Sequence, residues 1–245
     1  MDLSIIIPTY NEARKIRRDI TAAADFLVAH MKAGEIILAD DGSRDGTVHV
    51  AQETPLPPGV TLRILHPAGH RGKGFALRSG IAASQGEHVM FADSGLTTPY
   101  ENVLRGLALI RTGQCELAHG SRMLPDSIVR IPQHHDRKIS SALFRLTLRL
   151  VLPVPGELTD TQCGFKVYRG NVARMLAREC VADGFLFDVE MLLRAVRHGY
   201  RVREFPIEWS CDRDSRITFR RSSWPILQEI FAVRRALASP SDGKP

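Results

Sequence analysis

Short apolar runs alternate with segments of helical periodicity through the first half of the chain. The runs are rich in isoleucine, leucine and valine, which is typical of buried parallel strands. They cover residues 3–7, 35–39, 61–65 and 89–92. Between the last two runs, one helix face carries Leu77, Gly80, Ile81 and Ser84. This alternation predicts an α/β fold with a mostly parallel central sheet and helices on both faces.

The rhythm changes beyond about residue 115. A strand is predicted near 117–120, then a polar, proline-containing loop over 125–136 and a helix over 137–152. The remaining elements are predicted helices near 171–177, 185–198 and 224–237, and a strand at 201–206. Because no linker or internal repeat interrupts the chain, we predict a single domain over residues 1–238 and a disordered tail over 239–245.

Composition narrows the class of protein. A hydrophobic content of 44% and a charged content of 24% are ordinary for a globular chain. No apolar run reaches the length of a membrane-spanning helix, and a strand begins at once, which leaves no room for a signal peptide. The four cysteines are scattered and form no metal-binding pair. These features favour a cytoplasmic protein with reduced thiols.

The formal net charge is +6, and its distribution along the chain is uneven. An excess of this kind indicates an anionic partner, which is phosphate, nucleic acid or a membrane surface, or else a solvated basic face. No nucleic-acid motif accompanies it, so we expect no nucleic-acid partner. The basic cluster comprises Arg213, Arg216, Arg220 and Arg221, followed by Arg234 and Arg235.

Acidic residues follow two of the predicted strands. Asp40 and Asp41 come after the run at 35–39, and Asp93 comes after the run at 89–92. Ligands of open α/β sheets bind at the carboxyl ends of the strands. A carboxylate there suits a divalent cation and a diphosphate, and the alternative is an aspartate that only caps a turn.

A glycine-rich loop precedes the helix that contains Leu77. It holds Arg71 and Lys73 between Gly69 and Gly74. Backbone N–H groups and basic side chains at the start of a helix form a plausible phosphate cradle.

Seven segments, in this order, resemble an inverting family 2 glycosyltransferase with a GT-A, Rossmann-like fold. They resemble above all the polyprenyl-phosphate branch, that is, dolichyl-phosphate mannose synthases and dolichyl-phosphate β-glucosyltransferases. The resemblance covers roughly residues 2–212, with a nucleotide-sugar half over about 1–122 and an acceptor half over about 123–238. The matching segments are 4–12, 40–47, 70–74, 93–99, 120–122, 160–166 and 187–190.

The resemblance implies transfer of a hexose from a nucleotide sugar to a polyprenyl phosphate. UDP-glucose is the favoured donor and GDP-mannose the next. It implies that the donor binds Pro8, Tyr10, Glu12, Asp41, Arg71, Lys73, Asp93 and Ser94. It implies catalytic roles for Asp93, Arg122, Asp160, Gln162 and Asp188. It implies that Arg122 binds the acceptor phosphate. From the clusters of basic residues we expect Arg137, Arg213 and Arg216 to contact this phosphate as well.

The family also implies Mg²⁺ or Mn²⁺, held by an Asp-x-Asp pattern, and here this chain departs from it. Its sequence reads Asp93, Ser94 and Gly95, so the second acid is missing. Asp93, with Thr97, diphosphate oxygens and water, would have to hold the metal, because Mg²⁺ often binds through one or two carboxylates and substrate phosphates. The alternatives are neutralisation by arginine and lysine, or a sugar-nucleotide binding protein without activity.

The acceptor decides whether a general base is needed. A phosphate monoester, with a second pKa of about 6, is already ionised at neutral pH and can attack without losing a proton. A hydroxyl acceptor, our alternative, would need a base such as Asp160 or Asp188. The lipid would come from a membrane, so we predict peripheral contact at the cytoplasmic face through the basic helix at 137–152. The alternative is that this helix is buried, with an exposed cationic edge.

Overall fold

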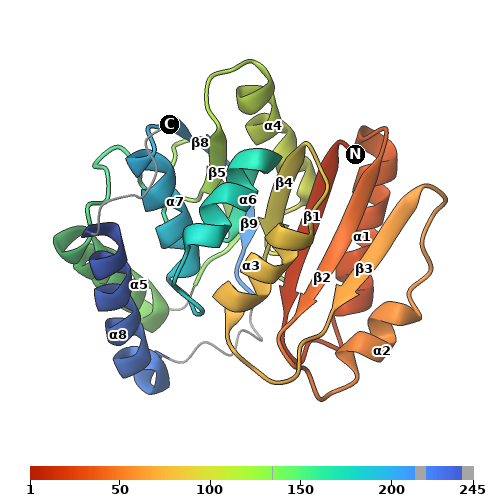
Figure 1. Ribbon diagram of the computed structural model, residues 1–245, viewed down its shortest axis with the longest axis horizontal. Coiled ribbons are helices and arrows are strands. Elements are labelled where there is room, and N and C mark those ends of the chain that lie inside the picture. Colours follow the sequence, from red (N-terminus) through yellow and green to blue (C-terminus); the bar gives the residue numbers. More distant parts are fainter. Residues whose placement is uncertain (134, 213–218, 239–245) are drawn as a thin grey trace.

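Seven strands form the central sheet of the computed structural model, which describes residues 1–133, 135–212 and 219–238 (Figure 1). The side chains of residues 135–137 and 219–223 also lie outside the described part. The sheet order is β3 (Val60–Leu65), β2 (Gly34–Asp40), β1 (Leu3–Thr9), β4 (His88–Ala92), β7 (Phe165–Arg169), β5 (Leu117–Ser121) and β8 (Val202–Pro206). Only β7 runs antiparallel to its neighbours among these strands. The predicted α/β class with a mostly parallel sheet is confirmed.

Helices cover both faces of this sheet because successive strand side chains point to opposite faces. Ile6 packs in one core with α3 (Lys73–Ala83), α6 (Gly170–Glu179) and α7 (Phe187–Arg197). Ile5 and Ile7 pack in the other core with α1 (Ile16–His30) and α4 (Val103–Arg111). The remaining short helices are α2 (Thr47–Gln52) and the 3₁₀ turn η1 (Tyr100–Asn102).

A second, two-stranded sheet pairs β6 (Ile128–Ile131) with β9 (Glu208–Ser210) in parallel. The predicted loop over 125–136 is therefore wrong at β6. All four side chains of β6 are exposed and the strand is short, so no buried periodicity marks it in the sequence. Pairing with a strand about 80 residues away along the chain, rather than local sequence, creates this element.

Two long helices lie together at the end of the molecule opposite β3 (Figure 1). They are α5 (His135–Val151) and α8 (Phe219–Ala238), and they contribute Leu148, Ile230 and Val233 to the core. None of the described helices combines the length and the apolarity that crossing a bilayer requires. The predicted disordered tail over 239–245 lies outside the described residues.

Candidate active site

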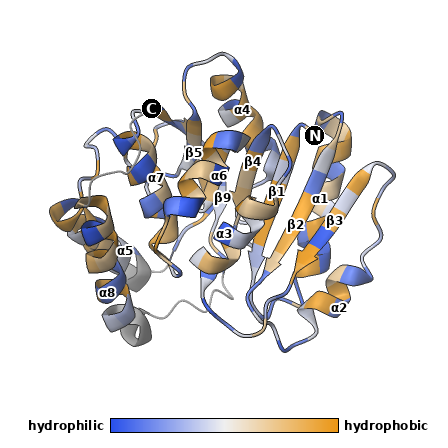
Figure 2. Ribbon diagram, in the orientation of Figure 1, coloured by the Kyte–Doolittle hydropathy of each residue, from blue (hydrophilic) through white to orange (hydrophobic). Residues whose placement is uncertain are grey.

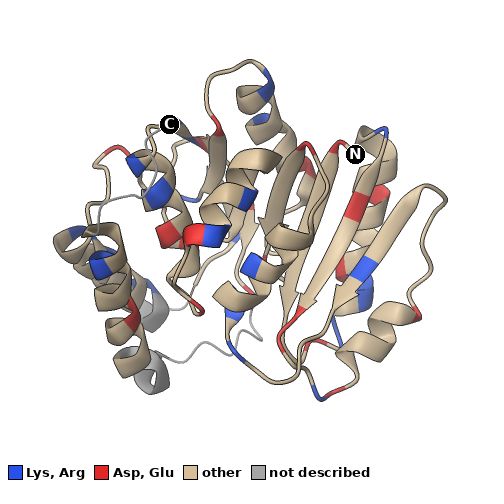
Figure 3. Cartoon of the chain, in the orientation of Figure 1, with Lys and Arg blue, Asp and Glu red and all other residues tan. Residues whose placement is uncertain are grey.

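The carboxyl ends of β2, β1 and β4 meet at one edge of the sheet because these strands are parallel neighbours. Acidic and basic residues gather along this edge (Figure 3). Asp40, at the end of β2, is buried. Its carboxylate accepts hydrogen bonds from the backbone N–H groups of Gly42 (3.0 Å) and Ser43 (2.9 Å) and lies 2.7 Å from His66 Nδ1. Asp40 thus shapes the turn that carries the next acid.

Asp41 holds the glycine-rich loop in place. Its two carboxylate oxygens accept the backbone N–H groups of Arg71 and Gly72, each at 2.8 Å, and Oδ2 lies 2.7 Å from His70 Nδ1. The ring of His70 in turn stacks on Tyr10, with 4.1 Å between ring centroids. Asp41 therefore fixes the loop, while Tyr10 presents an exposed aromatic ring at the same edge.

Lys73 joins two carboxylates that are far apart in the sequence. Its Nζ lies 2.7 Å from Asp93 Oδ1 and 2.8 Å from Asp188 Oδ2. Burial alone would lower the pKa of Lys73, but the two carboxylates outweigh it and raise this pKa well above its ordinary value. The other oxygen of Asp188 is buried and has no hydrogen-bond partner in the described part of the chain. This centre therefore keeps unused acceptor capacity.

Gly164 makes room for Asp93. The backbone N–H of Asp93 donates to the carbonyl of Gly164 at 3.2 Å, and a Cβ added at Gly164 would lie 2.1 Å from Asp93 Oδ2. Only glycine allows the Asp93 carboxylate to occupy this position.

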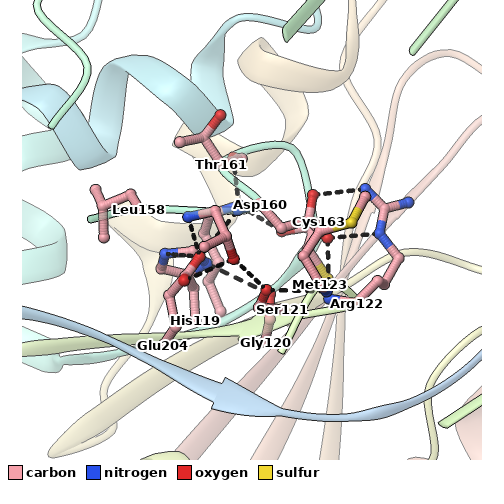
Figure 4. Close-up of polar contacts among 12 residues, drawn as sticks. His119, Gly120, Ser121, Arg122, Met123, Leu158, Asp160, Thr161, Cys163 and Glu204 are labelled. Carbon is pink, nitrogen blue, oxygen red and sulfur yellow. Dashed lines mark hydrogen bonds and ion pairs between the residues drawn. The ribbon is translucent and has the colours of Figure 1, made fainter. Parts of the chain in front are cut away.

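Arg122, whose side chain is 16% exposed, and the completely buried Asp160 form a two-pronged ion pair (Figure 4). Asp160 accepts from Arg122 Nε at 2.6 Å, from Nη2 at 2.7 Å and from the backbone N–H at 3.0 Å. Burial would raise the pKa of the Asp160 carboxyl, but the hydrogen bonds and charge of Arg122 outweigh it and lower this pKa. The guanidinium also lies 5.1 Å from the centroid of the Trp209 ring. Asp160 thus holds Arg122 in a fixed orientation.

A layer of polar side chains beneath this pair supports the loop before β7 (Figure 4). Glu204 Oε1 accepts the backbone N–H groups of Thr159 and Asp160, both at 2.9 Å. Lys166, which is completely buried, donates to the carbonyls of Thr161 (3.2 Å) and Cys163. These two charged residues position the Asp160 loop from inside the sheet.

Three other predicted residues have partners within the protein. Arg71 pairs with Asp183 at 3.1 Å and lies 3.8 Å from the ring centroid of Phe75. The hydroxyl of Ser94 donates to Asp19 at 2.7 Å. The carbonyl of Thr97 accepts the N–H of Ser210 at 2.8 Å. Their binding roles stay predictions, with Arg71 nearest the exposed edge.

The remaining predicted positions are spread over the same region. Pro8 lies in β1, and the Glu12 N–H donates to the Thr47 hydroxyl at 2.8 Å. Gln162 has a buried side-chain amide nitrogen without a hydrogen-bond partner among the described residues. Arg137 lies in α5 but its side chain is not described, and Arg213 and Arg216 lie outside the described residues.

Sequence reasoning missed several supporting residues of this site. Lys166 interrupts an apolar strand with a charge, a signal that could have marked it. Glu204 likewise stands in the short strand β8. Lys15 and Asp212, whose charged atoms are 2.6 Å apart, are separated by almost the whole chain and gave no signal. Only the fold brings such partners together.

Comparisons with known proteins identify the family of this chain. A model of the family described as glycosyl transferase family 2 matches residues 4–175. Glycosyltransferase AglD of Haloferax volcanii is 30% identical over 223 residues, which are 90% of this chain and 35% of that protein. The dolichyl-phosphate beta-glucosyltransferase of Homo sapiens is 30% identical over 219 residues, 85% of this chain and 67% of that protein. The chain thus spans about a third of the first relative and two thirds of the second.

A solved structure shares the fold. It is glucosyl-3-phosphoglycerate synthase from Mycobacterium tuberculosis in complex with Mn²⁺, UDP-glucose and phosphoglyceric acid. Its TM-score is 0.71 at 18% identity, and the match covers 99% of this chain and 82% of that one. The sheet, the acids at its carboxyl edge and a family match over most of the chain lead to one conclusion: this chain belongs to glycosyltransferase family 2 and is a glycosyltransferase.

Proposed function

We propose that this chain transfers glucose from UDP-glucose to the phosphate group of a polyprenol, with inversion at the anomeric carbon. The relatives named dolichyl-phosphate beta-glucosyltransferase support the acceptor class and the sugar. GDP-mannose is the competing donor.

The hydrogen bonds and ion pairs of the two candidate bases, Asp160 and Asp188, support a phosphate rather than a hydroxyl as the acceptor. Both oxygens of Asp160 are bound by Arg122, and this carboxyl is completely buried with a lowered pKa. Asp188 is ion-paired with Lys73. The carboxylate of Asp160 is thus a weak proton acceptor, and that of Asp188 is engaged by an ammonium group, which disfavours a hydroxyl acceptor that needs a base. A phosphate monoester, with its second pKa of about 6, brings its own ionised oxygen.

Cationic side chains at the edge suit the negative charge of both substrates. Lys73 Nζ lies 2.7 Å from Asp93 Oδ1, and Arg122 is the fixed guanidinium beside Asp160. A planar guanidinium binds phosphate oxygens with two parallel hydrogen bonds. Catalysis would then consist of positioning the phosphate oxygen and stabilising the charge on the departing diphosphate.

The residues present fit a divalent cation at Asp93. Its carboxylate is 42% exposed at the strand end, so it remains accessible to a ligand, and its oxygens are the hard donors that Mg²⁺ and Mn²⁺ prefer. Bound there, the cation would act as a Lewis acid towards the diphosphate leaving group. Gly95 offers no side-chain donor, so Asp93 would be the ligand of this loop, with Thr97 as a secondary candidate.

Transfer of radiolabelled glucose into lipid tests the proposal. The purified chain is incubated in detergent with labelled UDP-glucose and either dolichyl phosphate or dolichol, which differ only in the phosphate. We expect labelled lipid from dolichyl phosphate alone, at a rate that falls below about pH 6 as the acceptor phosphate takes up a proton. Equal transfer to dolichol would refute the phosphate acceptor. A higher rate with GDP-mannose would identify GDP-mannose, rather than UDP-glucose, as the donor.

We further propose peripheral binding to a membrane through α5 and α8. Exposed apolar side chains form one stripe on each helix. The two helices are neighbours at one end of the molecule, and Figure 2 shows hydrophobic positions along both. Arg149, on the same helix α5, donates to the carbonyl of Leu158, next to the Asp160 loop. Apolar stripes beside basic residues suit a bilayer interface. The apolar stripes comprise Ile139, Leu143, Leu146 and Leu150 on α5, and Trp224, Leu227 and Phe231 on α8.

Flotation with vesicles of phosphatidylcholine and phosphatidylglycerol tests this surface. We expect the wild-type chain to float and the double variant Leu143→Glu/Leu150→Glu to remain at the bottom of the gradient. Val28→Glu, at an exposed apolar residue of α1, is the matched control and should float. A wild-type chain that stays unbound, or that pairs through the stripes into a dimer by size-exclusion chromatography, would refute membrane binding.

A further inference from the structure

The loop after β4 is held so that residue 95 points in a fixed direction. Asp19 of α1 accepts hydrogen bonds from the Ser94 hydroxyl and the Gly95 N–H, both at 2.7 Å. Gly95 has a φ of +101° and Leu96 a φ of +48°. A side chain at position 95 would therefore leave the backbone in one defined direction.

That direction leads to the carboxylate of Asp212. A Cβ added at Gly95 would lie 3.0 Å from Asp212 Oδ2 and 3.4 Å from its Cγ. The Asp212 carboxylate therefore lies beside position 95, where the second acid of the Asp-x-Asp pattern would stand.

The end of β9 fixes Asp212 relative to the same loop. The Ser210 N–H donates to the carbonyl of Thr97 at 2.8 Å, and the Cys211 N–H donates to the carbonyl of Ile131 at 2.9 Å. Because these bonds flank Asp212 on its N-terminal side, its position is coupled to that of the loop carrying Asp93.

Asp93 and Asp212 have parallel electrostatic surroundings. Lys73 Nζ lies 2.7 Å from Asp93, and Lys15 Nζ lies 2.6 Å from Asp212. Lys15 is also 3.6 Å from Glu12. Each acid thus has an ammonium group as counter-charge, and a lysine on a flexible stem can give up a carboxylate to a stronger cation.

We propose that Asp212 supplies the second carboxylate of the divalent-cation site, in place of the acid missing at position 95. The inference rests on the proposed function, which calls for a cation at the diphosphate. It explains why glycine is tolerated at position 95: two carboxylates in contact there would repel each other. An acid at 95 and an acid at 212 are therefore alternatives.

Binding of Mn²⁺, measured by electron paramagnetic resonance of the free ion with saturating UDP, tests this assignment without relying on turnover. Asp212→Asn keeps the shape and removes the charge. We expect the affinity for Mn²⁺ to fall by about tenfold or more, the range that loss of even an outer-shell group costs at metal sites.

The variant Lys15→Met tests whether Asp212 binds the metal or only forms an ion pair with Lys15. It breaks the same contact as Asp212→Asn but leaves the carboxylate, so Mn²⁺ should bind at least as tightly as to the wild type. Equal losses in Lys15→Met and Asp212→Asn would overturn the inference, as would wild-type affinity in Asp212→Asn or no Mn²⁺ binding by the wild type. Glu208→Gln, on the strand β9 that precedes Asp212, is the matched control and should leave the affinity for Mn²⁺ unchanged.

UDP binding by calorimetry with a chelator keeps this inference apart from the proposed function. A chain that transfers glucose to dolichyl phosphate but does not need Asp212 for Mn²⁺ refutes only the inference. A chain that binds no UDP, with or without Mn²⁺, refutes the proposed donor as well.

Discussion

Two groups of opposite charges at the same edge of the sheet differ in how firmly they are held. Asp160 is completely buried and receives three hydrogen bonds from Arg122. Asp93 has a side chain that is 42% exposed and shares the single ammonium of Lys73 with Asp188. One pair is locked and the other can exchange partners.

The difference assigns different tasks to similar side chains. The buried carboxylate of Asp160 cannot take up a proton or a metal without leaving the guanidinium of Arg122 unpaired, so Asp160 serves to orient Arg122. An accessible carboxylate paired with a flexible lysine can change partner when a substrate or cation arrives, as we propose for Asp93. Residue type alone does not distinguish these tasks; burial and the number of hydrogen bonds do.

Removing the locked acid should have the largest effect. We expect Asp160→Ala to lower the free energy of unfolding by about 3 kcal/mol, because the largely buried Arg122 is left without its counter-charge. Urea denaturation followed by circular dichroism measures it. The exposed pair of Arg130 and Glu208 provides the control, since Glu208→Gln should leave the urea midpoint nearly unchanged. A small loss in Asp160→Ala would mean that the pair is not locked.

Crowding the exposed carboxylate of Asp93 should have the second largest effect. Gly164→Ala would place a methyl group 2.1 Å from Asp93 Oδ2 in the present geometry, so Asp93 or the loop must shift. We expect about 1–3 kcal/mol of destabilisation and a large loss of glucose transfer. Gly156→Ala is the matched control because an added Cβ there meets nothing within 4 Å. Unchanged transfer in Gly164→Ala would show that the position of Asp93 does not matter.

Acid should weaken the support beneath the locked pair. His119 of β5 is completely buried, with its Nε2 3.5 Å from Glu204 Oε1. Burial lowers the pKa of His119 to about 3, from about 6.5 for the unfolded chain. Between these values the unfolded state binds the extra proton, so stability falls as the pH falls, by up to about 1.4 kcal/mol per pH unit. His119→Met should remove this part of the slope between about pH 6 and 4. His49→Gln, at an exposed histidine, should keep the wild-type slope, and an equal slope in all three proteins would contradict the assignment.

The smallest effect should be the coupling between Lys73 and the exposed carboxylate. A double-mutant cycle of Lys73→Met and Asp93→Asn should give about 1 kcal/mol or less, and the value should shrink with added salt. The corresponding cycle of Arg122→Met and Asp160→Asn should give a larger energy that salt hardly changes. Similar energies and salt dependence in the two cycles would show that the Arg122–Asp160 and Lys73–Asp93 pairs are held equally firmly.

Strands with a continuous apolar run were predictable from the sequence, whereas β6, β7 and β9 were not. Strands β1, β2 and β4 carry continuous apolar runs, so their existence and their order with the helices could be read directly. Strand β7 contains the buried charge of Lys166, and β6 and β9 are short and partly or fully exposed. These three form because distant segments offer hydrogen bonds, which no local pattern records.

The sequence by itself determined the fold class, the family and the acids at the strand ends, because local periodicity and short motifs carry that information. Which acid is locked, which is accessible and which stands opposite Gly95 was decided by the tertiary structure. Arg122 meets Asp160 across 38 residues, Lys73 meets Asp188 across 115, and Lys15 meets Asp212 across 197. The physical reason is that burial and charge pairing depend on distances through space, which the packing of the sheet and its helices sets.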